Sequence, residues 1–387
     1  MMRFWNKYNY EEHVVRTQDD YLLCVHRIPS VNSPPAEDIR SHMANATDKI
    51  KKDKNIQILN CMDNFHSHGQ CQPRRINQGK PVVLLYHGFL MSSEVWGYDV
   101  WMGNARGNKY SQTHLRLNPQ HLEFWQFSIN EYAIYDLPDV VDHILKVTGA
   151  SSLTYIGFSQ GTAQAFAGLS INQQLNQKIN LFIALAPATT PKGLHHPLID
   201  TFVKATPSVI YLVFGRMTPL KLALFWQRII SPPMFVKLID GAVGFLFGWT
   251  GRNMSPEQKL VSYQHLYSLT SVKSLVHWFQ IIRTGRFQMF DEMPSRLPYH
   301  TVNTVMDHVP PRFPTKQITT PIAIFYGGSD SLVDFDVLSA DLPSPLAYVK
   351  GIEKWEHLDF LWAENIEKHV HPDILKLLQH FNPLPKD

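Results

Sequence analysis

The chain has 387 residues, of which 44% are hydrophobic and 18% are charged. Globular proteins carry about 25% charged residues, so a chain this apolar can build a large core, which excludes disorder throughout. Lys and Arg number 36 against 33 Asp and Glu, and the resulting net charge of +3 is too small for a nucleic-acid-binding protein. The length permits two or three domains, or one large α/β domain with insertions.

The first residues read MMRFWNKYNYEEH and contain no apolar run that could serve as a secretory signal. We therefore expect a protein that faces the cytosol and is not secreted. No stretch has the roughly 18 uncharged apolar residues of a membrane-spanning helix. The two nearest candidates, residues 208–225 and 234–249, can lie on a membrane, but each is interrupted by charged side chains.

Strand-like segments at residues 13–16 and 21–28, joined by a turn, predict an N-terminal hairpin. Residues 31–80 are polar and lack periodicity, so we expect a flexible insert. Beyond it, short apolar runs typical of buried parallel strands alternate with helical patterns. The predicted strands are residues 81–86, 153–156, 181–186 and 322–326, and the predicted helices are residues 137–147, 160–170 and 369–381.

This alternation predicts an α/β fold with a doubly wound, mostly parallel sheet. Residues 189–314 break the rhythm with Pro-rich and aromatic-rich helical pieces, which predicts an insertion over one end of the sheet. We therefore expect a core in two parts, residues 1–188 and 315–387, with a helical cap or lid of residues 189–314 between them.

One motif in the core carries chemistry. Gly157-Phe158-Ser159-Gln160-Gly161 lies between a predicted strand and a predicted helix, which is the setting of a nucleophile elbow. Glycines allow the tight turn that lifts a serine hydroxyl above the sheet, and the following helix offers its positive end. The pentapeptide also occurs by chance as an ordinary turn, but its flanking elements favour Ser159 as a nucleophile.

A nucleophilic serine requires a base and an acid that orients the base, and in this fold both follow the serine, acid first. Asp330 comes just after the strand of residues 322–326, and His357 precedes the last helices. Asp334 and Asp336 are rival acids, but they lie further into the next element. We expect Ser159, Asp330 and His357 to meet at one rim of the sheet.

Acyl transfer also needs two N–H donors for the oxyanion. The residue after the nucleophile, Gln160, supplies one of them. The second should come from the loop after an earlier strand, where His87-Gly88-Phe89 follows the strand of residues 81–86, and we assign it to Phe89. A separate cluster, Cys61-x4-His66-x-His68-x2-Cys71, has zinc-binding residue types in a spacing of no common zinc site, so we treat it as chance.

These motifs resemble the acid lipase family of α/β-hydrolases, which includes gastric and lysosomal lipases and fungal steryl ester hydrolases. The phrases GFSQG, APATTPKGL and YGGSDSLVD favour the fungal lipid-droplet branch. The matching passages are residues 12–29, 87–96, 97–111, 124–138, 157–161, 184–194, 270–291, 327–334 and 356–362.

The resemblance implies the roles already assigned to Ser159, Asp330, His357, Phe89 and Gln160, with no metal or organic cofactor. It implies hydrolysis of long-chain steryl esters in lipid catabolism, or alternatively of triacylglycerols, under a cap that roofs an acyl-binding cleft. It further implies work at a lipid-droplet or endoplasmic reticulum surface, with no nucleic-acid partner.

One departure of the chain from the family lies beside the predicted oxyanion loop. A crossover helix usual between the HGF motif and GYDVW is missing, so Trp96 runs directly into Gly97. Residues 90–97 can span roughly 27 Å when extended, enough to retrace a strand, but they cannot form a covering helix. We therefore expect exposed apolar surface on one face of the sheet. Besides a steryl ester hydrolase and a triacylglycerol lipase, a third possible function is that of a catalytically impaired lipid-surface protein.

Overall fold

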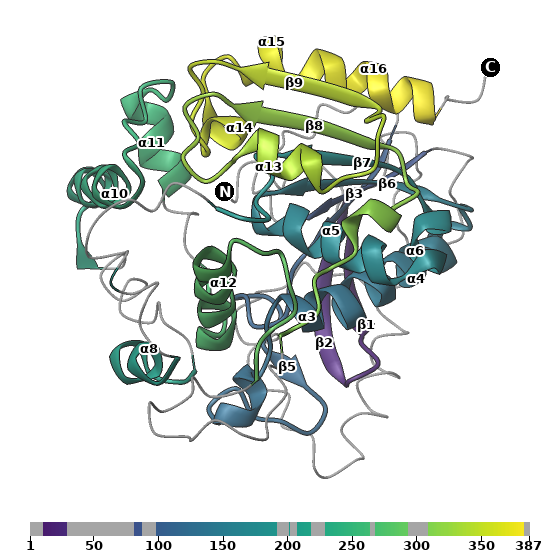
Figure 1. Cartoon of the computed structure of the whole chain (residues 1–387), viewed down its shortest axis with the longest axis horizontal. Coiled ribbons are helices and arrows are strands. Elements are labelled where there is room, and N and C mark those ends of the chain that lie inside the picture. Colours follow the sequence, from purple (N-terminus) through teal and green to yellow (C-terminus); the bar gives the residue numbers. More distant parts are fainter. Residues whose placement is uncertain are drawn as a thin grey trace.

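The computed structural model describes residues 11–28, 81–86, 98–191, 201, 207–217, 229–263, 268–292 and 309–382. In these ranges the chain forms one sheet in the order β1-β2-β4-β3-β6-β7-β8-β9, with β5 paired to β2 (Figure 1). The strands are β1 (Glu11–Arg16), β2 (Tyr21–Ile28), β3 (Val82–Tyr86), β4 (Asp99–Gly103), β5 (Thr113–His114), β6 (Leu153–Phe158), β7 (Ile179–Leu185), β8 (Ile322–Gly327) and β9 (Tyr348–Ile352).

The six strands from β4 to β9 along that order are parallel, whereas β1 and β2 form an antiparallel hairpin that joins the sheet through β4. The predicted mostly parallel α/β sheet is therefore confirmed. Sequence analysis did not identify β4 or β9. The edge strand β9 has half-buried and exposed residues in alternation rather than an unbroken apolar run, because only one side of an edge strand packs on a neighbour.

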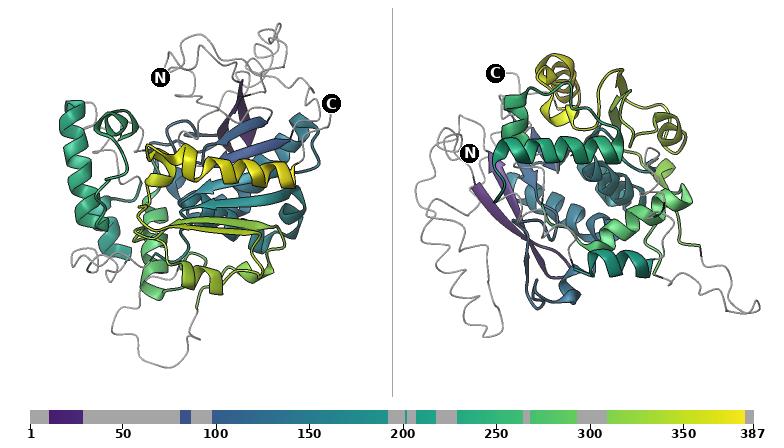
Figure 2. Two further views of the ribbon diagram at one scale, coloured as in Figure 1. Left: turned by 90° about the horizontal axis from the view of Figure 1, so that it is seen from above. Right: turned by 90° about the vertical axis from the view of Figure 1, so that its left-hand side faces the viewer.

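Helices cover both faces of the sheet (Figures 1 and 2). Side chains of α4 and α5 pack with Leu84 and Tyr155 on one face, and side chains of α14 and α16 pack with Val83 and Leu181 on the other. The core helices are α3 (Ile129–Glu131), α4 (Leu137–Thr148), α5 (Gln160–Ile171), α6 (Gln173–Lys178), α13 (Phe335–Ala340), α14 (Asp359–Trp362), α15 (Ile366–His369) and α16 (His371–Phe381). The core also contains the 3-10 helices η1 (Leu122–Trp125) and η4 (Thr315–Gln317) and the π-helix η2 (Tyr132–Asp136).

The expectation of exposed apolar surface beside β3 and β4 is wrong. Val83, Leu85 and Val100 are 1%, 7% and 6% exposed, and they belong to one hydrophobic cluster with side chains of α10, α14 and α16. This burial could not be foreseen from the local sequence. The strands on either side of this departure, β3 and β4, pair in parallel.

Between β7 and β8 the described residues form helices and no named strand: α8 (Pro207–Phe214), α10 (Pro232–Phe247), α11 (Pro256–Ser262) and α12 (Val272–Thr284). Figure 1 shows α10 and α11 beside the end of the sheet where β9 leads into α14. The exact boundaries of the cap stay a prediction. Among the described helices, none combines the length and apolarity needed to cross a membrane. The predicted insert of residues 31–80 lies outside the described residues.

Candidate active site

Ser159 occupies a tight turn between β6 and α5. Its φ of 51° and ψ of −117° are unusual for a residue with a side chain, and such strain is typical of a functional turn. A Cβ on Gly161 would lie 2.5 Å from the Tyr86 carbonyl oxygen, and one on Gly157 would lie 2.9 Å from the Gly161 carbonyl carbon. Only glycine therefore fits at both positions. The turn holds the serine at the carboxyl end of the central strands.

Asp330 lies on the loop after β8, and this loop packs against the segment that carries His357. A Cβ on Gly327 would lie 2.2 Å from the Trp355 carbonyl oxygen, so glycine is required for this close approach. The Ser329 N–H donates a hydrogen bond of 3.0 Å to the same Trp355 oxygen. The backbone thus fixes the separation between the acid and the histidine.

The three predicted catalytic side chains come together in a hydrogen-bonded chain. Asp330 Oδ2 lies 2.7 Å from His357 Nδ1, and His357 Nε2 lies 2.7 Å from Ser159 Oγ. Because the carboxylate accepts the Nδ1–H, Nε2 is left as the acceptor for the serine hydroxyl. Asp330 also accepts the Leu332 N–H through its other oxygen, at 2.9 Å. This arrangement can remove a proton from Ser159.

Burial and aromatic contacts surround the imidazole. Asp330 and His357 are 6% and 4% exposed, so little water competes for their hydrogen bond. The Trp249 ring stacks on the imidazole with centroids 5.3 Å apart and an angle of 6°, and the Phe158 ring lies 5.0 Å away at 51°. Trp249 follows α10, so the inserted helical region contacts the candidate base directly.

The rival acids have other positions. Asp334 is the N-cap of α13, where its carboxylate accepts the Val337 N–H, and Asp336 lies in the first turn of the same helix. Another histidine, His277 of α12, is fully buried and donates from Nε2 to the Gln288 carbonyl oxygen at 2.8 Å. Burial lowers the pKa of His277 to about 4, as expected of a neutral structural histidine.

Gln160 is the first residue of α5, so its backbone N–H has no partner within the helix and is available at the positive helix end. Its side-chain Oε1 accepts a hydrogen bond of 3.1 Å from Trp278 Nε1 of α12, a contact that sequence analysis did not identify. Phe89, the other predicted oxyanion donor, lies outside the described residues. Tyr86, the last described residue before position 89, has its carbonyl oxygen against Gly161 of the serine turn.

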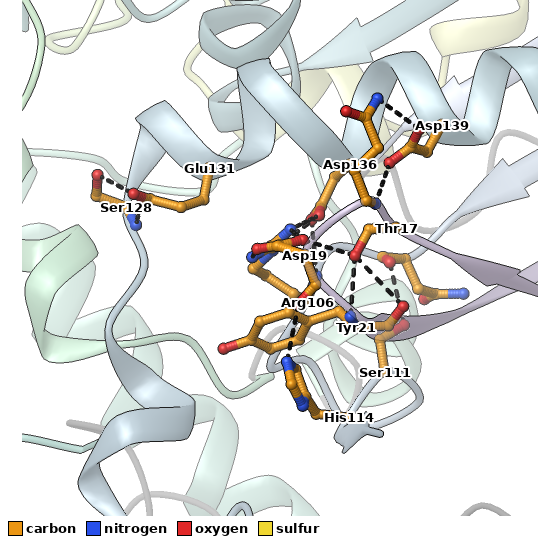
Figure 3. Close-up of polar contacts among 12 residues, drawn as sticks. Thr17, Asp19, Tyr21, Arg106, Ser111, His114, Ser128, Glu131, Asp136 and Asp139 are labelled. Carbon is orange, nitrogen blue, oxygen red and sulfur yellow. Dashed lines mark hydrogen bonds and ion pairs between the residues drawn. The ribbon is translucent and has the colours of Figure 1, made fainter. Parts of the chain in front are cut away.

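A buried ion-pair network, also missed by sequence analysis, lies at the hairpin end of the sheet (Figure 3). The Arg106 side chain is 1% exposed and lies 2.7 Å from Asp136 Oδ1 and 2.9 Å from Asp19 Oδ1. Its guanidinium also lies 4.0 Å from the centroid of the Tyr21 ring. Burial raises the pKa of Asp136, and Arg106 opposes that shift. The network joins the β1–β2 turn to the start of α4.

A cavity of about 420 Å³ borders this network, and its lining includes Asp19, Tyr21 and Arg106 but none of the three candidate catalytic side chains. In the described parts of the chain, no group of three or more His, Cys, Asp or Glu side chains could hold a metal ion. The Cys61–Cys71 cluster lies outside them.

The fold and the serine turn define the chain as an α/β-hydrolase. A model of the α/β-hydrolase fold matches residues 81–364, and one of a partial α/β-hydrolase lipase region matches residues 2–99. The chain therefore belongs to the α/β-hydrolase fold family, and it is a lipase- or esterase-type member.

Curated relatives are lipases. A probable lipase of Schizosaccharomyces pombe is 43% identical, over 98% of this chain and 76% of its own length. The human gastric triacylglycerol lipase is 31% identical, over 98% of this chain and 89% of its own length. Among solved structures, a soluble variant of the monoglyceride lipase of Saccharomyces cerevisiae has a TM-score of 0.51 at 11% identity, over 95% of this chain and 94% of that one. This last likeness shows the fold alone.

Proposed function

We propose that the chain releases fatty acids from long-chain steryl esters through a covalent acyl-enzyme formed on Ser159. The observation that carries this proposal is the hydrogen-bonded chain from Ser159 through His357 to Asp330, with 2.7 Å at each link. Substrate choice is supported by the resemblance to fungal steryl ester hydrolases, whereas the ester chemistry is supported by the geometry itself.

In the first half-reaction, His357 Nε2 accepts the Ser159 proton as Oγ attacks the ester carbonyl carbon. The oxyanion accepts hydrogen bonds from the Gln160 N–H and, in our assignment, the Phe89 N–H, and loss of one such donor costs about 2.7–4 kcal/mol of transition-state stabilisation. Asp330 stabilises the imidazolium. The C–O bond then breaks, and the alcohol leaves with the proton from Nε2.

In the second half-reaction, water attacks the acyl carbon and gives a proton to His357 Nε2. The C–Oγ bond breaks, Ser159 recovers its proton from the imidazolium, and the fatty acid departs. The short distances at the candidate triad support a competent enzyme over the impaired lipid-surface protein that the missing crossover helix suggested.

A second candidate substrate is triacylglycerol, which the 31% identity to human gastric triacylglycerol lipase favours. The two substrates are separated by assaying the purified chain on cholesteryl oleate and triolein emulsions of equal ester content. Faster release of oleate from the steryl ester is expected, and a clear preference for triolein would replace that proposal by the alternative. The variant Ser159→Ala is the control, since it should lose both activities while remaining folded.

We also propose that the protein acts at a lipid-droplet or endoplasmic reticulum surface that faces the cytosol. Resemblance to the fungal lipid-droplet branch supports the location. Further support comes from α10, which presents Met234, Leu238 and Phe245 at 61%, 51% and 50% exposure on one side of the helix. Flotation of the chain with lipid droplets tests this proposal. A smaller fraction of Leu238→Glu than of the parent protein should be found in the floating layer, and an equal fraction would contradict the assigned surface.

A further inference from the structure

Glu356, the residue before His357, is held by the segment that follows α10. Its side chain is 4% exposed, and its carboxylate accepts hydrogen bonds from the Thr250 N–H at 2.9 Å, the Thr250 hydroxyl at 2.8 Å and the Gly251 N–H at 2.8 Å. A buried carboxylate needs such donors, because an unpaired one is costly. Every one of these donors belongs to the cap region.

The same segment contacts the imidazole and the acid loop. Trp249, immediately before Thr250, is 7% exposed and stacks on His357 at an angle of 6°. Two residues earlier, the Phe247 carbonyl oxygen accepts a hydrogen bond of 2.8 Å from Ser331, the neighbour of Asp330. Residues 247–251, which we call the cap anchor, therefore contact the imidazole and a chain neighbour of both the base and the acid.

We propose that Glu356 and Trp249 are positioning residues for His357, so that turnover depends on the docked cap anchor. The inference rests on the proposed function, because it takes His357 as the base. Glu356 fixes the backbone on which the imidazole is mounted, and the Trp249 ring fixes the plane of the imidazole. A displacement of about 1 Å can cost about a hundredfold in rate, so a loose imidazole should be visible in kcat.

The test uses the full chain and a short soluble ester, p-nitrophenyl butyrate, to avoid effects on lipid binding. Glu356→Ala and Trp249→Ala should each lower kcat by about 10- to 100-fold, with KM changed less than about threefold, because they disturb the reacting geometry rather than substrate binding. Trp249→Phe should recover most of the rate, since it keeps an aromatic ring against the imidazole.

Asn253→Ala is the matched control. Asn253 ties the same two segments together, through hydrogen bonds of 3.0 Å to the Lys354 carbonyl oxygen and 2.7 Å to Asp359 Oδ2, but its side chain makes no hydrogen bond to His357 or Glu356. It should lower the melting temperature with kcat within about threefold of the parent. If docking alone mattered, Asn253→Ala would lower kcat as much as Glu356→Ala.

Unchanged kcat in folded Glu356→Ala and Trp249→Ala would overturn the inference, as would an equal loss in Asn253→Ala. Should Glu356→Ala fail to fold, Thr250→Val takes its place, because it removes only the hydroxyl donor to Glu356. A folded Thr250→Val with the kcat of the parent would also count against the inference. Parent protein with no Ser159-dependent hydrolysis would overturn the proposed function itself. Parent activity with insensitive positioning variants would overturn only this inference.

Discussion

Removal of the Arg106 side chain should destabilise the protein strongly, because the fully buried carboxylate of Asp136 would lose its cation. Asp136 is 0% exposed, whereas the Asp19 side chain is 27% exposed and can be hydrated. Breaking a buried ion pair by deleting one partner costs about 3–5 kcal/mol, which is a large part of the 5–15 kcal/mol that stabilises a typical domain. We therefore expect Arg106→Met to lower the free energy of unfolding by about 3–5 kcal/mol.

Denaturant unfolding of Arg106→Met and of the double variant Arg106→Met/Asp136→Leu measures this cost. The double variant should regain at least half of the lost stability, because no buried carboxylate is left without its cation. Burial raises the pKa of Asp136 in the folded protein. The free-energy cost of holding this carboxylate ionised in the folded state therefore increases as pH rises. Arg106→Met should thus approach the parent in stability at low pH. A cost below about 1 kcal/mol, or a double variant weaker than the single, would refute this reasoning.

Two further predictions concern the site and the pH response. Asp330→Asn should leave the protein folded and lower kcat for a short ester by about 10⁴-fold, because His357 loses the acceptor that orients it; a loss of less than about tenfold would contradict the assigned acid. The pKa of His277 is lowered to about 4 by burial, so the unfolded chain takes up the proton first as pH falls below about 6.5, and stability is lost from there toward pH 4. Between about pH 7 and pH 5, protonation linked to His277 should lower the free energy of unfolding by about 2 kcal/mol. His277→Gln should flatten the plot of unfolding free energy against pH in this range, and an unchanged slope would exclude His277 as the cause.

Local sequence was sufficient for the parts of the site that follow from strand order. The G-x-S-x-G turn and the acid after β8 could be predicted, because carboxyl ends of parallel strands meet at one edge. The histidine was placed by its order after the acid and before the last helices. The close approach of Gly327 and Gly328 to the backbone of residues 353–355 was not predicted and is a finding of the structure.

Other contacts of the site could not be predicted. Thr250 donates a hydrogen bond to Glu356, although the two residues are 106 positions apart in the sequence. A single Glu beside a histidine does not indicate which distant residue will bind its carboxylate. The pairing of Arg106 with Asp136 has the same origin, since the two residues are 30 positions apart and no local pattern pairs them. The edge strand β9 likewise depends on the distant strand that pairs with it. Each of these features is decided by tertiary packing rather than by local pattern.

The proposed function requires Ser159 to be a nucleophile that His357 activates. The most direct measurement is labelling of the full chain with a fluorophosphonate, followed by mass spectrometry of the peptide that contains residue 159. We predict a single stoichiometric phosphonyl adduct on Ser159, lost in Ser159→Ala and formed far more slowly in His357→Ala. Folded parent protein that takes up no label, or takes it up at a different residue, would contradict the account.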